Sequence, residues 1–328
     1  MQYKSVKGFT GFGQLGILIA FIGAGLILTG LAQLLIGMQI VPPDVPPEKL
    51  GEVMESVLLQ PENVGYARLA QIVGTFLLLF VPAVLFSWVV NGMHPHWLGF
   101  NSYVNAKQVL LGFAIIFTAN LLSAPFAELS KIITAKFPDL DALAKQIEFN
   151  YDRQVKALSH LGSWPEFLMA IVVMAFVPAL FEEVFFRGVL QNFFEKWWKN
   201  PCIAIVFTSI LFSFIHLSIY LFLSCAILGF ALGLMFYITR NIWVNVFAHF
   251  INNAIAVAQL FYLSLNNKDI KVDELDPKVP WWLGLITLIA LVILFVILKR
   301  VSLVNREKVM AKEASLLARV NSRNPFKS

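Results

Sequence analysis

The chain has 328 residues, of which 58% are hydrophobic and only 14% are charged, and its formal net charge at pH 7 is +5. A soluble domain carries about 25% charged residues, so this composition excludes an ordinary soluble protein and predicts that lipid covers much of the surface. The positive charge does not indicate nucleic-acid binding, because the basic residues fall mostly in one terminal tail. Cys202 and Cys225 lie in apolar runs and are interpreted as small core residues.

Eight apolar segments approach or exceed the length of about 20 residues that a membrane-spanning helix requires. They cover residues 15–37, 69–90, 108–127, 167–190, 201–217, 221–239, 242–265 and 281–298. The fifth and sixth segments are separated by almost nothing, so one of them is expected to be short or re-entrant. The sequence therefore predicts an all-α polytopic membrane protein, with a single transmembrane domain over residues 1–300 and a basic cytoplasmic tail over residues 301–328.

Lysine and arginine residues gather on one side of these segments, which marks that side as cytoplasmic. They are Lys4, Lys7, Lys107, Lys196, Lys199, Arg240, Lys299, Arg300, Arg306, Lys308, Lys312, Arg319, Arg323 and Lys327. The opposite side carries an acidic first loop (Asp44, Glu48, Glu52, Glu55 and Glu62) and a mixed loop over residues 268–278. We expect the protein to lie in a bacterial inner membrane. Both of its termini are then expected to be cytoplasmic. The tail is typical of an interfacial helix attracted to anionic lipid.

An amphipathic segment lies between the third and fourth spans. Apolar residues recur there at helical spacing behind Asp139, which can cap a helix: Leu140, Leu143, Ala144, Ile147, Tyr151, Val155 and Leu158. We interpret the segment as a helix that lies on the outer face of the membrane. The alternative is a lid that controls access to the bundle.

The fourth apolar segment carries two adjacent carboxylates, Glu182 and Glu183, and the cation Arg187. Ionisable side chains at membrane depth are costly and usually functional. Glu183 and Arg187 are four residues apart with the acid first, which favours an ion pair, whereas Glu182 points about 100° away and is left to act as a base. Pro178 is expected to bend the helix beside them. The alternative is a charged cluster that reaches the cytoplasmic surface.

Two further motifs lie on later apolar segments. The first is Phe212 followed four residues later by His216, and the second is His249 followed four residues later by Asn253. His249 and Asn253 share a helix face from which Asn252 points away, and together they can donate hydrogen bonds to one oxygen. The alternatives are a core histidine at position 216 and a polar patch that joins two helices.

Together the motifs predict a hydrolase. Glu182, assisted by His216, would deprotonate a water molecule, and His249 with Asn253 would stabilise the oxyanion that forms on the attacked carbonyl. The Glu183–Arg187 ion pair would hold the geometry of the site.

The same motifs, in the same order, resemble those of the CAAX-protease and bacteriocin-processing (abortive-infection) family of intramembrane proteases. The family pattern is E-E-x-x-x-R, then F-x-x-x-H, then H-x-x-x-N or D, and it covers about residues 167–259 here. The resemblance implies an eight-helix membrane fold and hydrolysis of peptide bonds near the membrane surface. It also implies Glu182, His216, His249 and Asn253 as the functional set, with peptides or membrane-anchored proteins as substrates.

The resemblance leaves the role of a metal open. Zinc needs about three protein ligands, which Glu182, His216 and His249 offer. We favour a metal-free site, because a His/Asn pair suits an oxyanion better than zinc. Two other functions compete with proteolysis: a non-catalytic membrane scaffold or peptide-immunity protein that keeps the family pocket, and a transporter that uses the buried charges as an ion relay.

Overall fold

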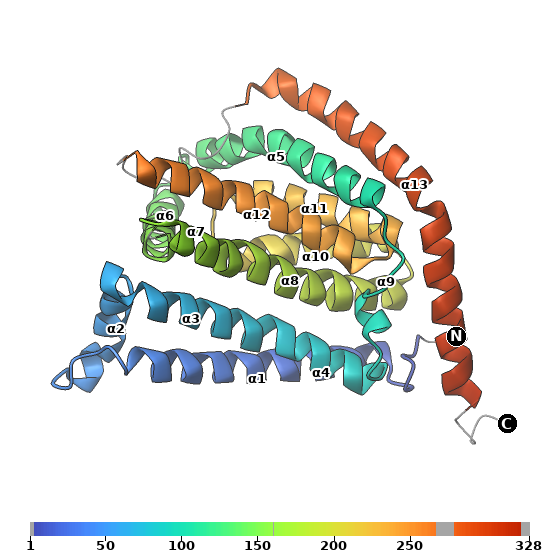
Figure 1. The fold of residues 1–328 in the computed structure, drawn as a ribbon, viewed down its shortest axis with the longest axis horizontal. Helices are drawn as coiled ribbons and strands as arrows, with labels where there is room; N and C mark the ends of the chain where they lie inside the picture. Colours follow the sequence, from blue (N-terminus) through green and yellow to red (C-terminus); the bar gives the residue numbers. More distant parts are fainter. Residues whose placement is uncertain (1–2, 160, 267–278, 323–328) are drawn as a thin grey trace.

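The computed structural model describes residues 3–159, 161–266 and 279–322, and these are helical with short connections (Figure 1). The predicted loop over residues 268–278 and the tail residues Arg323 and Lys327 lie outside the described residues. The first half of the chain forms α1 (Gly11–Gly37), η1 (Pro47–Lys49), α2 (Leu50–Leu58), η2 (Pro61–Asn63), α3 (Val64–Thr75), η3 (Phe76–Phe80), α4 (Val81–Val90), η4 (Pro95–Leu98), α5 (Ala106–Thr134) and α6 (Pro138–Leu158). The second half forms α7 (Trp164–Ala170), η5 (Ile171–Phe176), α8 (Val177–Glu183), η6 (Val184–Gln191), α9 (Asn192–Trp198), α10 (Pro201–Ile215), α11 (Phe222–Thr239), α12 (Ile242–Leu265) and α13 (Trp281–Ser322).

The protein is an integral membrane protein. Among the described residues, seven helical stretches are long and apolar enough to cross a bilayer: Gly11–Gly37, Pro61–Val90, Ala106–Thr134, Trp164–Trp198, Phe222–Thr239, Ile242–Leu265 and Trp281–Val320. The fifth predicted segment is helix α10, which is apolar but only 15 residues long. The all-α polytopic fold is thus confirmed, and the expectation that the fifth or sixth segment is short applies to the fifth.

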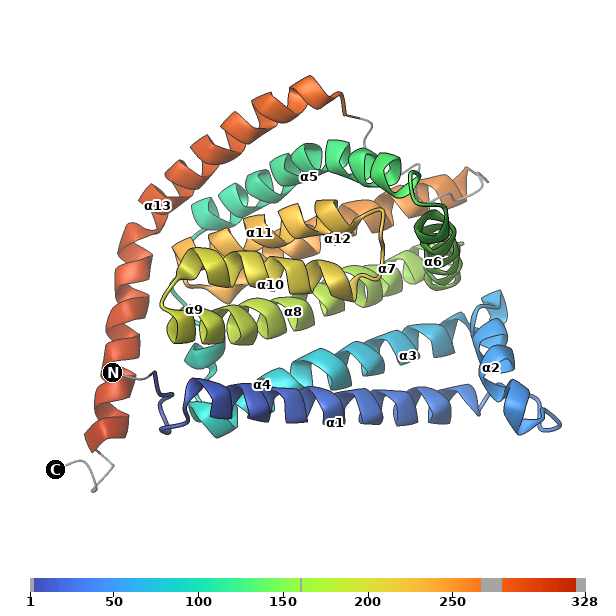
Figure 2. The same ribbon diagram turned by 180° about the vertical axis from the view of Figure 1, so that it is seen from behind.

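The spanning helices lie side by side, so the bundle has two distinct ends (Figures 1 and 2). One end holds the start of α1, the start of α5, the α9–α10 turn and the α11–α12 turn. We call it the basic end, because Lys7, Lys107, Lys199 and Arg240 lie at these positions. The other end, the far end, holds α2 and α6. The arrangement agrees with the separation of charge that the sequence predicts.

Helix α13 runs without a break across residue 300, where the sequence analysis places the start of the tail. Its first half packs along α5, and its second half turns across the basic end (Figure 1). Gln108 Nε2 donates to Ser302 Oγ at 3.0 Å, and Lys196 Nζ donates to Glu313 Oε1 at 2.9 Å. The second half of α13 is therefore attached to the bundle, and the division into two domains stays a prediction.

Helix α6 forms where the amphipathic pattern predicts it. The helix begins at Pro138 behind Phe137, so the expected cap at Asp139 is wrong. Its first turn is held by Tyr220, whose hydroxyl donates to Asp141 Oδ1 at 2.8 Å. Its last turn is held by Arg68, which donates to the carbonyl of Leu158 from two nitrogens at 3.0 and 3.2 Å. The helix is thus attached at both ends to the bundle that it covers.

Tyr220 gives a spectroscopic test of this attachment. Burial and the Asp141 carboxylate raise the pKa of its phenol from 10.0 to about 12. Because the folded state holds the proton more tightly, the hydrogen bond stabilises the fold fully below pH 10.0 and loses its effect as the pH rises to about 12. The ultraviolet difference spectrum between wild type and Tyr220→Phe is expected to show a phenolate forming near pH 12. A phenolate that forms near pH 10 would contradict the contact.

Candidate functional site

The fourth span changes its winding on both sides of the two carboxylates. It contains the π-helical stretches η5 and η6, with α8 between them. Pro178, at the start of α8, has no N–H to donate to the carbonyl of Met174, and the wider π turn accommodates this loss. Glu183 ends α8 and η6 follows at once, so both carboxylates lie where the helix changes geometry. Single π turns of this kind are frequent at functional sites.

Glu183 lies in a fully buried polar network. Arg187 Nη1 donates to Glu183 Oε1 at 3.0 Å, the pair that the four-residue spacing predicts, and the two side chains are 3% and 0% exposed. Arg187 also donates to the carbonyl of Gly229 at 3.1 Å, and its guanidinium lies 4.6 Å from the centre of the Phe212 ring. Asn245 Nδ2 donates to Glu183 Oε2 at 3.1 Å. Both carboxylate oxygens are therefore bonded, as a buried charge requires.

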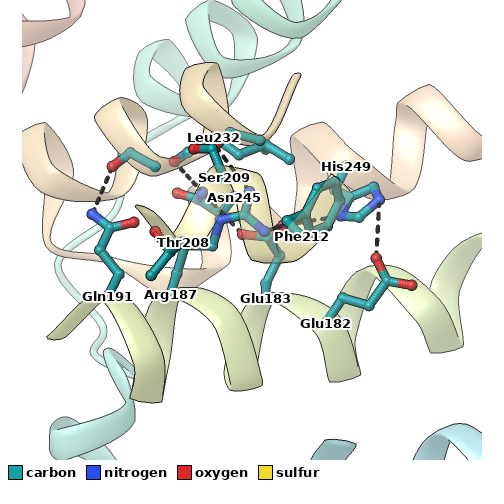
Figure 3. Close-up of polar contacts among 12 residues, drawn as sticks. Glu182, Glu183, Arg187, Gln191, Thr208, Ser209, Phe212, Leu232, Asn245 and His249 are labelled. Carbon is teal, nitrogen blue, oxygen red and sulfur yellow. Dashed lines mark hydrogen bonds and ion pairs between the residues drawn. The ribbon is translucent and has the colours of Figure 1, made fainter. Parts of the chain in front are cut away.

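His249 joins the two carboxylates (Figure 3). Its Nδ1 lies 2.9 Å from Glu183 Oε1, and its Nε2 lies 3.9 Å from Glu182 Oε2. In Figure 3 both glutamates point from the fourth span toward the helix that carries His249. Glu182 Oε2 is buried and makes no hydrogen bond within the described part of the chain. The separation of 3.9 Å exceeds a direct hydrogen bond and suits a contact through one water molecule.

A cavity of about 220 Å³ adjoins this pair. Its wall includes His249, His216, Asn252 and Asn253, so three of the four residues predicted as catalytic share one space. His216 caps the end of α10, with its Nδ1 2.7 Å from the carbonyl oxygen of Phe212. The structure brings His249, and not His216, next to Glu182. The expectation that Asn252 points away is wrong, because Asn252 lines the cavity and donates to Asn253 Oδ1 at 3.3 Å.

Asn245 is a site residue that the sequence analysis missed. Besides bonding Glu183, it donates to the carbonyl of Leu232 at 2.7 Å, and it is 0% exposed. A signal for it exists, because Asn245, His249 and Asn253 follow one another at intervals of four on α12 and so share one face of the helix. The polar stripe on this helix is thus one turn longer than the motif alone indicates.

The residues offered as zinc ligands do not form a metal centre in the geometry described. Within residues 3–159, 161–266 and 279–322, no group of three or more His, Cys, Asp or Glu side chains is arranged to hold a metal ion. His249 approaches Glu182 and Glu183, whereas the Nδ1 of His216 is engaged by a backbone carbonyl. We therefore derive no chemical step through a metal.

Comparison with known proteins agrees with the motifs. Residues 164–255 match the family described as type II CAAX prenyl endopeptidase Rce1-like. An uncharacterized protein of Bacillus subtilis (strain 168), YpbD, is 30% identical over 112 residues, which cover 34% of this chain and 57% of YpbD. The match thus spans little more than half of that relative's length. No solved structure matches the chain.

The family match covers the whole span that carries Glu182, Glu183 and Arg187, together with α10, α11 and the first half of α12. It coincides with the region, about residues 167–259, over which the sequence motifs resemble CAAX proteases, so that resemblance is confirmed. Residues 164–255 therefore form a domain of the Rce1-like family of type II CAAX prenyl endopeptidases.

Proposed function

We propose that the protein is an intramembrane endopeptidase of the CAAX type, which hydrolyses a peptide bond with a water molecule held between Glu182 and His249. The single observation that carries this proposal is the 3.9 Å separation of Glu182 Oε2 and His249 Nε2 beside the cavity. A water oxygen at that position can hydrogen-bond both side chains. Glu182 Oε2 has no hydrogen bond among the described residues that would compete for that water.

Glu183 would act on the reaction through His249. Because a carboxylate only accepts hydrogen bonds, Nδ1 of His249 carries the proton in the contact with Glu183. The Nε2 of the neutral ring then has a lone pair that accepts a hydrogen bond from the water. This differs from the sequence-based hypothesis, in which His216 assists Glu182. Glu183, Arg187 and Asn245 are positioning residues in this scheme.

The water would lose a proton to Glu182 as its oxygen attacks the carbonyl carbon of the substrate. The tetrahedral intermediate needs hydrogen-bond donors for its oxyanion. The Asn253 amide would supply one donor from the cavity wall, which His216 also lines. Collapse of the intermediate would break the C–N bond, and the protonated Glu182 carboxyl would give its proton to the departing amine.

The substrate in this proposal is a peptide or a membrane-anchored protein, with membrane lipid around the bundle and no nucleic acid. We further propose a bacterial inner membrane as the location, with the basic end in the cytoplasm, as the charge distribution favours. The purified protein should be assayed in detergent against a quenched peptide library.

Glu182→Gln is expected to lower kcat/KM by about 10²–10⁴, because the amide cannot take the proton of the water. The matched control is Glu128→Gln on α5, whose side chain is 66% exposed and remote from the cavity. Retained cleavage in Glu182→Gln would contradict the assignment of the base. Loss of cleavage on chelation, with recovery on adding zinc, would replace the metal-free scheme. A folded wild type that cleaves nothing would favour the non-catalytic scaffold.

A further inference from the structure

The cavity beside His249 is closed toward the basic end. The side chains beyond its floor are buried and bond across the helices: Gln191 Nε2 donates to the carbonyl of Gly233 at 2.9 Å, and Arg187 donates to that of Gly229. Asn245 bonds the carbonyl of Leu232, a residue that lines the cavity. Gln191 and Asn245 are 0% exposed and Arg187 is 2% exposed. These contacts join η6 and α12 to α11 and leave packed protein between the cavity and the basic end.

The far end is built differently, because the α10–α11 hairpin is short. Helix α10 has 15 residues and helix α12 has 24, which correspond to lengths of about 22 and 36 Å. Both helices start at the basic end. Figure 2 shows the backbone of the α10–α11 turn ending before the end of α12, and Tyr220 in this turn reaches α6 through its hydrogen bond to Asp141. His216 lies at the end of α10 and also lines the cavity, so the cavity extends to the α10–α11 turn.

A groove of about 490 Å³ lies next to the cavity, between α6 and the ends of α5 and α10. Ser218, in the α10–α11 turn, lines both spaces. The other walls of the groove come from the last turns of α5 and α10, from α6 through Ile147, and from the start of α11. Helix α6 also contributes Tyr151 to the wall of the cavity. The groove is mostly apolar, with serine and threonine side chains among its lining residues.

We propose that substrates enter the site from the far end, which lies outside the cytoplasm. The inference rests on the proposed function for the identity of the site, and on the basic end for the orientation. The substrate is then a polypeptide on the outer side of the membrane, whose apolar residues pass through the groove beneath α6 and whose scissile bond reaches Glu182 and His249. A substrate polypeptide in the cytoplasm would meet the packed side chains between the cavity and the basic end instead.

Cysteine accessibility tests this route without any need for catalysis. Single cysteines are placed in a background in which Cys202 and Cys225 are serine: Ser218→Cys at the site, Glu52→Cys at the far end and Lys199→Cys at the basic end. Glu52 and Lys199 are both exposed, so they report orientation alone. A membrane-impermeant maleimide is added to intact bacterial spheroplasts that express the full chain, and again after permeabilisation.

Ser218→Cys and Glu52→Cys are expected to react in intact spheroplasts, and Lys199→Cys only after permeabilisation. If Ser218→Cys reacts only after permeabilisation while Glu52→Cys reacts before it, the route is wrong. A Ser218→Cys that is unreactive in both states would also overturn an open route. Reaction of Lys199→Cys in intact spheroplasts would reverse the orientation and place the substrate in the cytoplasm. Failure of the proposed hydrolysis would appear in a different experiment, the peptide-cleavage assay, as equal cleavage by wild type and Glu182→Gln.

Discussion

Arg187→Ala is expected to lower the free energy of unfolding by about 3–5 kcal/mol, the usual cost of removing one partner from a buried ion pair. The substitution leaves the Glu183 carboxylate charged at a position with 0% exposure. It also removes the hydrogen bond to Gly229 and the contact with the face of Phe212. Denaturant or thermal unfolding in mild detergent, followed by circular dichroism, measures the loss.

The matched control is the exposed ion pair of Glu128 and Lys131 on α5. Glu128→Ala is expected to cost less than about 1 kcal/mol, because water screens the charges of exposed pairs. The double variant Glu183→Gln/Arg187→Met removes both charges and should be more stable than Arg187→Ala, since it leaves no unpaired buried charge. If Arg187→Ala and wild type unfold at the same temperature or denaturant concentration, the network contributes little to the stability of the fold.

The helices of this fold could be predicted from the sequence, because lipid exposure selects long apolar segments and hydropathy detects such segments. The fifth predicted segment ends at residue 217, whereas α10 ends at Ile215, because the apolar run extends past the helix into the turn. Leu217 occupies this turn with a φ of 47°, a left-handed conformation that a leucine rarely adopts. Its side chain is 74% exposed, so Leu217 lies at the surface of the bundle. An apolar residue there has the same hydropathy in a turn as in a helix.

The candidate site could be predicted only where its contacts lie within one helix. The Glu183–Arg187 pair follows from spacing alone. Which carboxylate meets which histidine depends on how α8 and α12 are rotated about their axes, and two adjacent glutamates differ by about 100° of rotation. Packing sets this rotation, through contacts such as that of Asn245 with Glu183. Three of the residues that the sequence analysis named, His216, His249 and Asn253, line the cavity, whereas the histidine that lies beside Glu182 is His249 and not His216.

His249→Ala is expected to reduce kcat/KM by about 10²–10⁴, because its ring nitrogens lie 3.9 Å from Glu182 Oε2 and 2.9 Å from Glu183 Oε1. Its removal leaves Glu182 without the partner that holds the water and leaves Glu183 Oε1 to Arg187 alone. His96→Ala is the matched control, since both histidines are 6% exposed and His96 lies at the basic end, away from the cavity.

The measurement is cleavage of one fluorogenic peptide by wild type, His249→Ala, His96→Ala and Glu183→Gln. A fall in kcat with little change in KM would assign His249 to the transition state, whereas a rise in KM alone would assign it to substrate binding. Glu183→Gln keeps an oxygen that accepts from Nδ1 of His249 but loses the charge, so its activity is expected between those of wild type and His249→Ala. If His249→Ala and His96→Ala lower kcat/KM equally, both losses are explained by impaired folding. His249 would then have no catalytic role.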